Sequence, residues 1–192
     1  MVNRCLWAGN DDQMVSYHDL EWGTPIHDDR LLFEFLILEG VQAGLSWSTI
    51  LKKRENYRKA FDNFDYNKIA RYTDHKVEEL MENEGIIRNR LKITAIIKNA
   101  KAILNIQKDF GSFNKYIWKF VNYKTIDNKL RELSEIPSKT EQSEQMSKDL
   151  KKRGFKFVGP TICYAFMQAV GMVNDHLIDC FRYKEINAYI SK

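Results

Sequence analysis

The segment LKKRGFKFVGPT at residues 150–161 indicates two helices joined by a very short hairpin. Gly154 stands where a helix commonly ends in the left-handed conformation, and Pro160 suits the first position of the helix that follows. We therefore expect helices at about 141–153 and 160–171, with GFKFVG between them. Bare amides at a new helix N-terminus beside a basic helix end would bind phosphate without reading base sequence. An ordinary αα-hairpin is the alternative.

Helical patterns also dominate the rest of the chain. Segment 28–39, DDRLLFEFLILE, opens with acidic residues and is apolar nearly all round, which predicts a buried helix. Ser46 is a suitable N-cap for a helix over 46–61. Further helices are expected at 66–72, 74–83, 88–107 and 112–121, and residues 124–139 form an irregular connection. With no convincing strand alternation, the sequence predicts one all-α domain over residues 1–192, with a helical lobe at about 28–123 and the two-helix segment at about 141–171.

Composition restricts the class of protein. The 192 residues are 44% hydrophobic and 12% aromatic, which is enough for a packed core. Three cysteines, an odd number, do not resemble a secreted disulfide framework and favour a reducing cytoplasm. We expect no signal peptide and no membrane span, because no apolar stretch is long enough.

Basic residues form three groups, although the net charge of +4 is by itself weak evidence for a nucleic-acid partner. The groups lie at 52–54, 88–92 and 148–156. On a helical chain they could line up as a stripe that faces phosphates. Solvated helix faces are the alternative interpretation.

Two pairs of metal-type side chains lie at opposite ends of the chain. Cys5 and His18 are near the start, and His176 and Cys180 are near the end at a spacing that one helical turn would place on one face. Two thiolates and two imidazoles would complete a closed tetrahedral zinc site. The alternative is that the cysteines are small buried hydrophobes and the histidines satisfy core hydrogen bonds. Cys163 lies in an apolar run and is expected in the core.

Glu39 breaks the local pattern, because it ends an apolar run near the C-terminus of a predicted buried helix. The helix dipole disfavours a carboxylate there, and burial of an ionised acid is costly without a partner. Such conflicts are typical of functional positions, although an ion pair is an equal alternative. The same half of the sequence holds Trp7, Tyr17, Trp22 and Trp47. Each ring alone suits a core, but together with a carboxylate they could enclose a flat cation such as an alkylated nucleobase.

Four long blocks of the chain resemble one known family. They are RCLWAGNDDQMVSYHDLEWGTP at 4–25, LEGVQAGLSWSTILKKRENYRKAFDNFD at 38–65, GIIRNRLKITAIIKNAKA at 85–102 and MSKDLKKRGFKFVGPTICYAFMQAVGMVNDHLIDC at 146–180. In order and spacing, over about residues 3–182, they are similar to the bacterial 3-methyladenine DNA glycosylase I family. The resemblance implies a helix-hairpin-helix DNA glycosylase fold, in which a zinc site ties the N- and C-terminal segments together.

The resemblance also implies roles for individual residues. One structural Zn²⁺ per chain would be bound by Cys5, His18, His176 and Cys180. Glu39 would be the catalytic residue that contacts the polar edge of the flipped base, and the base would be bound by Trp47, Tyr17, Trp7 and Trp22. DNA would be contacted by a wedge at Gly44 and Leu45 and by the hairpin at Gly154, Lys156, Gly159 and Thr161. Met14 stands where the family often has a tyrosine, so we expect a pocket with one ring fewer.

The implied activity is that of a monofunctional DNA glycosylase, which flips out and hydrolytically excises 3-methyladenine from alkylated duplex DNA in base excision repair. Its partner would be double-stranded DNA containing alkylated purines, and the enzyme would be a monomer of the bacterial cytoplasm, associated with the nucleoid through DNA. Asp175 stands near the position of an aspartate that steadies the cationic sugar in many related enzymes, but its neighbour His176 suggests a role in support of the metal site. A non-catalytic lesion-binding module and a zinc-stabilised interaction domain are the alternative functions.

Overall fold

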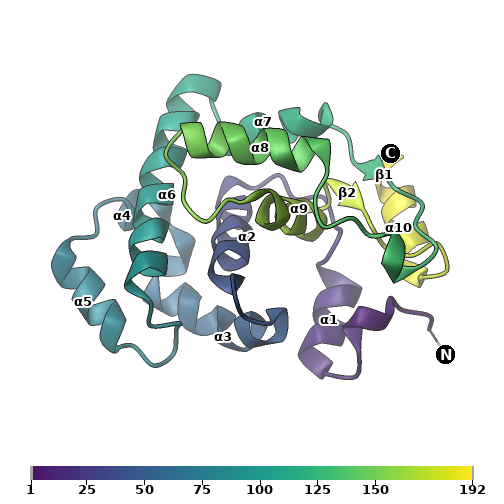
Figure 1. Ribbon diagram of the computed structural model, residues 1–192, viewed down its shortest axis with the longest axis horizontal. Coiled ribbons are helices and arrows are strands. Elements are labelled where there is room, and N and C mark those ends of the chain that lie inside the picture. The colour runs from purple at the N-terminus through teal and green to yellow at the C-terminus, as the bar shows by residue number, and fades with distance from the viewer. Residues whose placement is uncertain (1, 192) are drawn as a thin grey trace.

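The computed structural model describes residues 2–191, and helices make up most of it (Figure 1). The helices are α1 Asp12–Leu20, α2 Asp29–Gln42, α3 Trp47–Ala60, α4 Tyr66–Ile69, α5 Asp74–Glu82, α6 Arg90–Phe110, α7 Phe113–Trp118, α8 Glu141–Lys152, α9 Pro160–Ala169 and α10 Phe181–Ile190. Short 3₁₀ turns lie at Leu6–Ala8, Asp62–Phe64, Lys119–Val121 and Leu133–Glu135. Two-residue strands, β1 Ile126–Asp127 and β2 Val173–Asn174, pair in parallel.

The helical class predicted from the sequence is confirmed, with differences at the ends of elements. Helix α2 continues to Gln42, so Glu39 lies inside its last turn and does not end it. Helices α1 and α10 and the β1–β2 pair were not predicted. The apolar periodicity of α1 is weak, and its start is fixed by the Asp11 carboxylate, which accepts hydrogen bonds from the amides of Gln13 and Met14.

Helix α2 is the central element of the core. Its residues from Leu32 to Val41 are all buried, as expected for a helix that is apolar nearly all round. It packs against α9, α3, α6 and α7. Because α2 is covered on every side, any cavity that reaches its surface must be formed between it and these neighbours.

Helices α8 and α9 form the predicted pair, joined by a seven-residue turn over residues 153–159 (Figure 1). Gly154 has φ of 91°, a left-handed conformation that a side chain would strain. The amide of Gly154 donates to Lys151 O at 3.0 Å and that of Phe155 to Leu150 O at 3.1 Å, which together end α8 as a Schellman motif. Phe155 and Val158 are buried, so the turn is anchored to the core.

The two ends of the chain lie on the same side of the molecule (Figure 1). The Phe181 amide at the start of α10 donates to Asn3 O at 3.0 Å. This contact places the segment before α1 against the segment that leads into α10. A shared metal site would need this arrangement, because its predicted ligands lie near both ends of the chain. Within residues 2–191, no helix has the length and apolar character needed to cross a bilayer.

Candidate functional site

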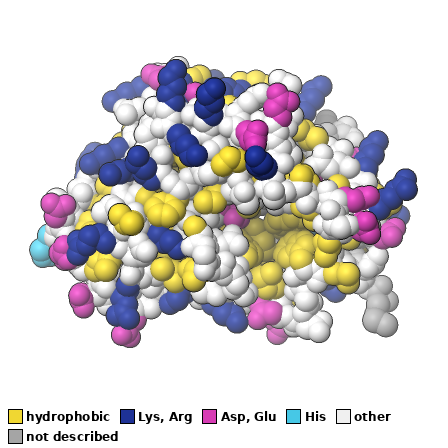
Figure 2. Space-filling model, viewed as in Figure 1, with side chains coloured by type: hydrophobic (Ala, Val, Ile, Leu, Met, Phe, Trp, Pro, Cys, Tyr) yellow, Lys and Arg dark blue, Asp and Glu magenta, His cyan; other side chains and the backbone are white. Residues whose placement is uncertain are grey.

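A cavity of about 370 Å³ opens where α1, α2, α3 and α9 meet. Figure 2 shows a hollow with a hydrophobic lining on the face of the molecule seen in this view. The residues of the wall come from distant parts of the sequence: Trp7, Met14, Tyr17, Trp22, Glu39, Gln42, Trp47, Ile136, Ala165 and Gln168. All five residues predicted to meet the base are therefore in one wall, and Met14 lies beside them.

Glu39 is the acid of this cavity. The residue is 5% exposed, and no hydrogen bond or ion pair reaches its carboxyl group from the described residues. The ion pair considered as an alternative is therefore not found. Desolvation by burial raises the pKa of Glu39 to about 8. A buried carboxyl group without a protein partner, at the edge of a cavity, is free to pair with a ligand.

The aromatic rings of the wall meet at an angle: those of Tyr17 and Trp47 are tilted by 47°, and those of Trp7 and Trp22 meet edge to face. Tyr17 and Trp47 have ring centroids 5.2 Å apart, and Trp7 and Trp22 have centroids 4.9 Å apart. The indole Nε1 of Trp47 is enclosed and has no hydrogen-bond partner within residues 2–191. An enclosed donor without a partner is rare in folded proteins and suggests that a bound group completes it.

The loop between α2 and α3 carries the predicted wedge. Gly44 has φ of 80°, and Leu45 is exposed at its tip. The loop is held from below by Lys92, whose Nζ donates to Val41 O and Ala43 O, each at 2.8 Å. A cation at the C-terminal end of a helix also complements the helix dipole. Lys92 was grouped with phosphate-facing residues, and this interpretation is wrong because its ammonium is committed to the loop.

Other basic side chains of the predicted stripe also bind groups within the protein and do not face solvent phosphates. The Arg54 guanidinium is buried against Glu34 and Glu21. Lys53 donates to the carbonyls of Glu84 and Gly85. The three basic groups therefore do not form a continuous stripe, and a smaller set of lysines near the α8–α9 turn remains. Figure 2 shows Lys and Arg side chains on the face that holds the hollow.

The turn between α8 and α9 presents the predicted DNA-contacting residues to solvent. Lys156 and Thr161 are exposed, and no side chain caps α9 at Gly159, which leaves its first amides accessible. Asn99 of α6 holds the turn from behind, because its Nδ2 donates to Lys156 O at 3.0 Å and its Oδ1 accepts from the Lys156 amide at 2.8 Å. Helix α6 thus supports both this turn, through Asn99, and the wedge loop, through Lys92.

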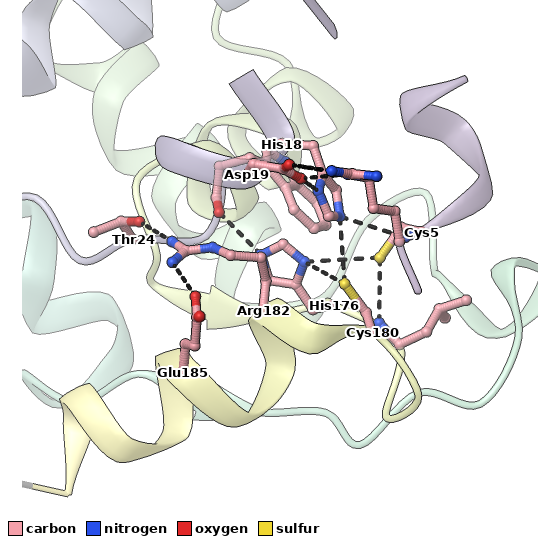
Figure 3. Close-up of polar contacts among 11 residues, drawn as sticks. Cys5, His18, Asp19, Thr24, His176, Cys180, Arg182 and Glu185 are labelled. Atoms are coloured by element: carbon pink, nitrogen blue, oxygen red, sulfur yellow. Dashed lines mark hydrogen bonds and ion pairs between the residues drawn. The ribbon is translucent and has the colours of Figure 1, made fainter. Parts of the chain in front are cut away.

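The four metal-type side chains meet in one buried cluster, formed by Cys5, His18, His176 and Cys180 (Figure 3). Their ligand atoms all lie within 4.8 Å of one another. Cys5 Sγ and Cys180 Sγ each lie 3.7 Å from His176 Nδ1, and Cys180 Sγ lies 3.5 Å from His18 Nε2. The pKa of the Cys180 thiol is held well below its usual range, first by the Cys5 thiol and then by the imidazoles, which favours a thiolate. The cluster could therefore hold a metal ion.

His176 and Cys180 have a spacing that would suit one helical turn, but they do not lie on a helix. They lie in a bend and turn after β2, closed by a hydrogen bond of 2.7 Å from the Cys180 amide to Leu177 O, and Cys180 is the N-cap of α10. A second layer fixes both imidazoles: His18 Nδ1 lies 2.8 Å from Asp19 Oδ1, and His176 Nε2 lies 3.0 Å from Trp22 O. These partners leave His18 Nε2 and His176 Nδ1 to face the cluster.

Asp175 lies apart from the cavity wall. Its buried carboxylate accepts hydrogen bonds from Tyr164 Oη at 2.7 Å, Gln168 Nε2 at 2.8 Å and Asn128 Nδ2 at 2.6 Å. A carboxylate that is satisfied in this way is not available to a sugar. Gln168 was not predicted as a site residue, although its polar side chain interrupts the apolar run TICYAFMQAVGMV in the way that Glu39 interrupts its own.

The helical fold and the site define a class of protein: a helical domain with an aromatic-lined cavity that holds one buried, unpaired acid. Residues 7–183 match the model of the methyladenine glycosylase family, and the chain belongs to that family. It is 53% identical over 180 residues to a DNA-3-methyladenine glycosylase of Haemophilus influenzae, a match that covers 94% of this chain and 97% of the relative.

Solved structures agree with this assignment. A crystal structure of 3-methyladenine DNA glycosylase I superposes with a TM-score of 0.91 at 52% identity, covering 93% of this chain and 98% of the other. A variant of 3-methyladenine DNA glycosylase I in complex with 3-methyladenine also superposes with a TM-score of 0.91, at 39% identity and covering 94% of this chain and 97% of the other. Fold and family are therefore established independently of the site geometry.

Proposed function

We propose that this protein is a monofunctional DNA glycosylase that excises 3-methyladenine from alkylated duplex DNA in base excision repair. The observation that carries the proposal is the cavity: Glu39 is buried, has no partner among the described residues and faces aromatic rings. The names of the similar proteins support the same activity. A non-catalytic lesion-binding module would share the DNA-facing turn but would not need an acid kept unpaired at a cost in stability.

Recognition follows from charge. Methylation at N3 makes the adenine of DNA cationic, and the faces of the tryptophan rings attract a cation. The Glu39 carboxylate supplies the charge opposite to that of the base, so a neutral adenine gains less in the same cavity. The cationic base leaves the sugar as a neutral molecule, and water attacks the anomeric carbon. No strong acid is needed to protonate the leaving base.

Access to the base requires DNA distortion. The α8–α9 turn would act as a helix-hairpin-helix anchor, with Gly154, Lys156, Gly159 and Thr161 against the phosphates of one strand. Gly44 and Leu45 would enter the duplex beside the lesion and stabilise the extruded state, which costs a few kcal/mol. A single chain forms the whole cavity, so we propose that a monomer acts on bacterial DNA in the cytoplasm.

The cluster of Cys5, His18, His176 and Cys180 fits zinc. Bond lengths of about 2.3 Å to sulfur and about 2.0 Å to nitrogen give tetrahedral edges of about 3.3–3.8 Å, and the three measured separations of 3.5–3.7 Å lie in that interval. Four protein ligands leave no position for water, so the ion would have a structural role. It would join Cys5 and His18 of α1 to the turn before α10 and close a very long loop.

The activity is tested by incubating the protein with methylated duplex DNA and analysing the released bases by chromatography. The expected result is free 3-methyladenine without strand scission, and a loss of release in Glu39→Gln. Glu82→Gln is the matched control, because Glu82 is an exposed acid of α5 far from the cavity. Release of 7-methylguanine in preference, or full activity in Glu39→Gln, would contradict the proposal.

The metal is tested by elemental analysis of the purified protein and by thermal denaturation with and without a chelator. We expect one zinc ion per chain and a lower melting temperature after its removal, with activity lost only as the protein unfolds. Cys163→Ser is the matched control for Cys180→Ser, since Cys163 is a buried thiol outside the cluster. A chelated protein that keeps its melting temperature would show that the cluster holds no structural ion.

A further inference from the structure

Asp175 is the centre of a hydrogen-bond network that reaches the cavity through one side chain. Its Oδ2 accepts from Tyr164 Oη and Gln168 Nε2, and its Oδ1 accepts from Asn128 Nδ2. Tyr164 and Gln168 both belong to α9, one turn apart, while Asn128 follows β1. Of these donors, only Gln168 also lines the cavity.

The network determines which way the Gln168 amide points. A carboxylate accepts hydrogen bonds and donates none, so the NH₂ group of Gln168 must face Asp175. The Oε1 atom must then point away from Asp175. Oε1 accepts no hydrogen bond from residues 2–191. It is also not fully enclosed, so a ligand can reach it. Gln168 therefore directs a free, accessible acceptor toward the cavity.

We propose that Gln168, oriented by Asp175, is a specificity-determining residue that accepts a hydrogen bond from the exocyclic amino group of the flipped base. The inference rests on the proposed function and deepens it. Adenine carries an amino group with two protons at position 6, whereas guanine carries a carbonyl oxygen there. An acceptor fixed opposite this position favours 3-methyladenine, and it repels 3-methylguanine although both bases are cationic. The charge of Glu39 alone does not make this distinction.

Fixing the amide matters because a free glutamine can rotate. A Gln168 side chain without Asp175 could present either its oxygen or its NH₂ group and accept both bases. Asp175 is thus a positioning residue, which acts through Gln168 and does not touch the base. Its burial away from the cavity agrees with that role.

The test measures release of 3-methyladenine and 3-methylguanine from the same methylated duplex, with protein in excess, as the ratio of the two kcat/KM values. We expect Gln168→Leu and Asp175→Asn each to lower this ratio roughly tenfold, the worth of one hydrogen bond. In the double variant Gln168→Leu/Asp175→Asn the ratio should fall no further than in Gln168→Leu, because Asp175 acts only through Gln168.

Tyr164→Phe is the matched control. It removes another donor to the Asp175 carboxylate but leaves the bond to Gln168, so we expect a lower melting temperature and an unchanged ratio. The inference is overturned if Gln168→Leu leaves the ratio unchanged or reduces release of both bases equally. If Asp175→Asn does not fold, the result for Gln168→Leu still decides. If the unmodified protein releases neither base, the proposed function itself fails, which is a distinguishable outcome.

Discussion

Helix α2 carries two buried glutamates that have opposite surroundings. Glu34 and Glu39 are 3% and 5% exposed. The Glu34 carboxylate accepts from Arg54 Nε at 2.5 Å and from Arg58 Nη2 at 2.7 Å, both from α3. Glu39, five residues later, has no such partner in residues 2–191. Burial removes the hydrating water from both acids, but only at Glu34 does the protein replace it with hydrogen-bond donors.

The difference separates a structural acid from a functional one. The Glu34 network is closed by Glu21, which accepts from Arg54 Nη1 at 2.6 Å, so every charge in it has a neighbour of opposite sign. On the other side of α2 the acid meets tryptophan and tyrosine rings and an open cavity. In the proposed function, the cationic base is the partner that Glu39 lacks in the protein itself. Burial alone therefore does not point to a functional acid, whereas burial without a partner is the reason that we propose this role for Glu39.

The largest expected effect is on stability at Glu34. Glu34→Gln leaves two arginines facing a neutral amide, and removal of one member of a buried pair costs about 3 kcal/mol or more in the free energy of unfolding. Urea denaturation measures this loss. Glu55→Gln is the control, because Glu55 is an exposed partner of the same Arg58 and should cost less than about 1 kcal/mol. A loss below 1 kcal/mol in Glu34→Gln would break the comparison.

Glu39→Gln should show the reverse behaviour. We expect kcat/KM for release of 3-methyladenine to fall on the order of 100-fold, which is about 2.7 kcal/mol of transition-state stabilisation. The free energy of unfolding should stay the same or rise, because an unpaired acid is replaced by a neutral group of the same shape. Single-turnover kinetics and urea denaturation measure the two quantities. A destabilised Glu39→Gln protein would mean that Glu39 has a structural partner after all.

A pH titration sharpens the comparison further. Burial raises the pKa of Glu39 to about 8, so the folded protein holds a proton that the unfolded chain loses above the ordinary glutamate pKa of 4.5. Stability from this group is full below pH 4.5 and is lost as pH rises toward 8, at up to about 1.4 kcal/mol per pH unit. Relative to Glu39→Gln, the unmodified protein should therefore lose about 2 kcal/mol between pH 6 and pH 8.

Denaturation curves at several pH values provide this measurement, and kcat/KM gives an independent one. If the carboxylate is the form that pairs with the cationic base, kcat/KM should rise with an apparent pKa near 8 in the unmodified protein and lose that rise in Glu39→Gln. Parallel stability curves for the two proteins would show that Glu39 is already ionised at pH 6.

The sequence predicted the elements that depend on local pattern. The Ser46 N-cap was found, with its Oγ accepting from the Thr49 amide at 3.2 Å, and so was the left-handed Gly154. Glu39 was noticed because it interrupts an apolar run. Its lack of a partner was not predictable, because Arg54 and Arg58 lie close along the sequence to both glutamates and only the packing of α3 shows which one they meet.

Other residues could not be assigned because their roles depend on contacts between distant segments. Lys92 was read as part of a basic stripe, yet its ammonium is enclosed beneath the α2–α3 loop. The spacing of His176 and Cys180 would suit a helical turn, but an irregular turn after β2 brings them together. The role that we propose for Gln168 depends on its hydrogen bond to Asp175. The periodicity of the sequence does not predict that contact.

Lys92 provides the smallest effect and a third case for the comparison, a buried cation that is paired by carbonyl groups. Desolvation lowers the pKa of Lys92, and its two hydrogen bonds to Val41 O and Ala43 O offset that cost. Lys92→Met keeps the length of the side chain and should lower the free energy of unfolding by about 1 kcal/mol. It should also lower kcat/KM on duplex DNA several-fold, because the loop that carries Leu45 loses its support.

Lys101→Met, at an exposed position of the same helix, is the control and should change neither stability nor kcat/KM. If Lys92→Met alters stability but not kcat/KM, Lys92 belongs with Glu34 as a purely structural charge; if it alters both, α6 supports the wedge as well as the core.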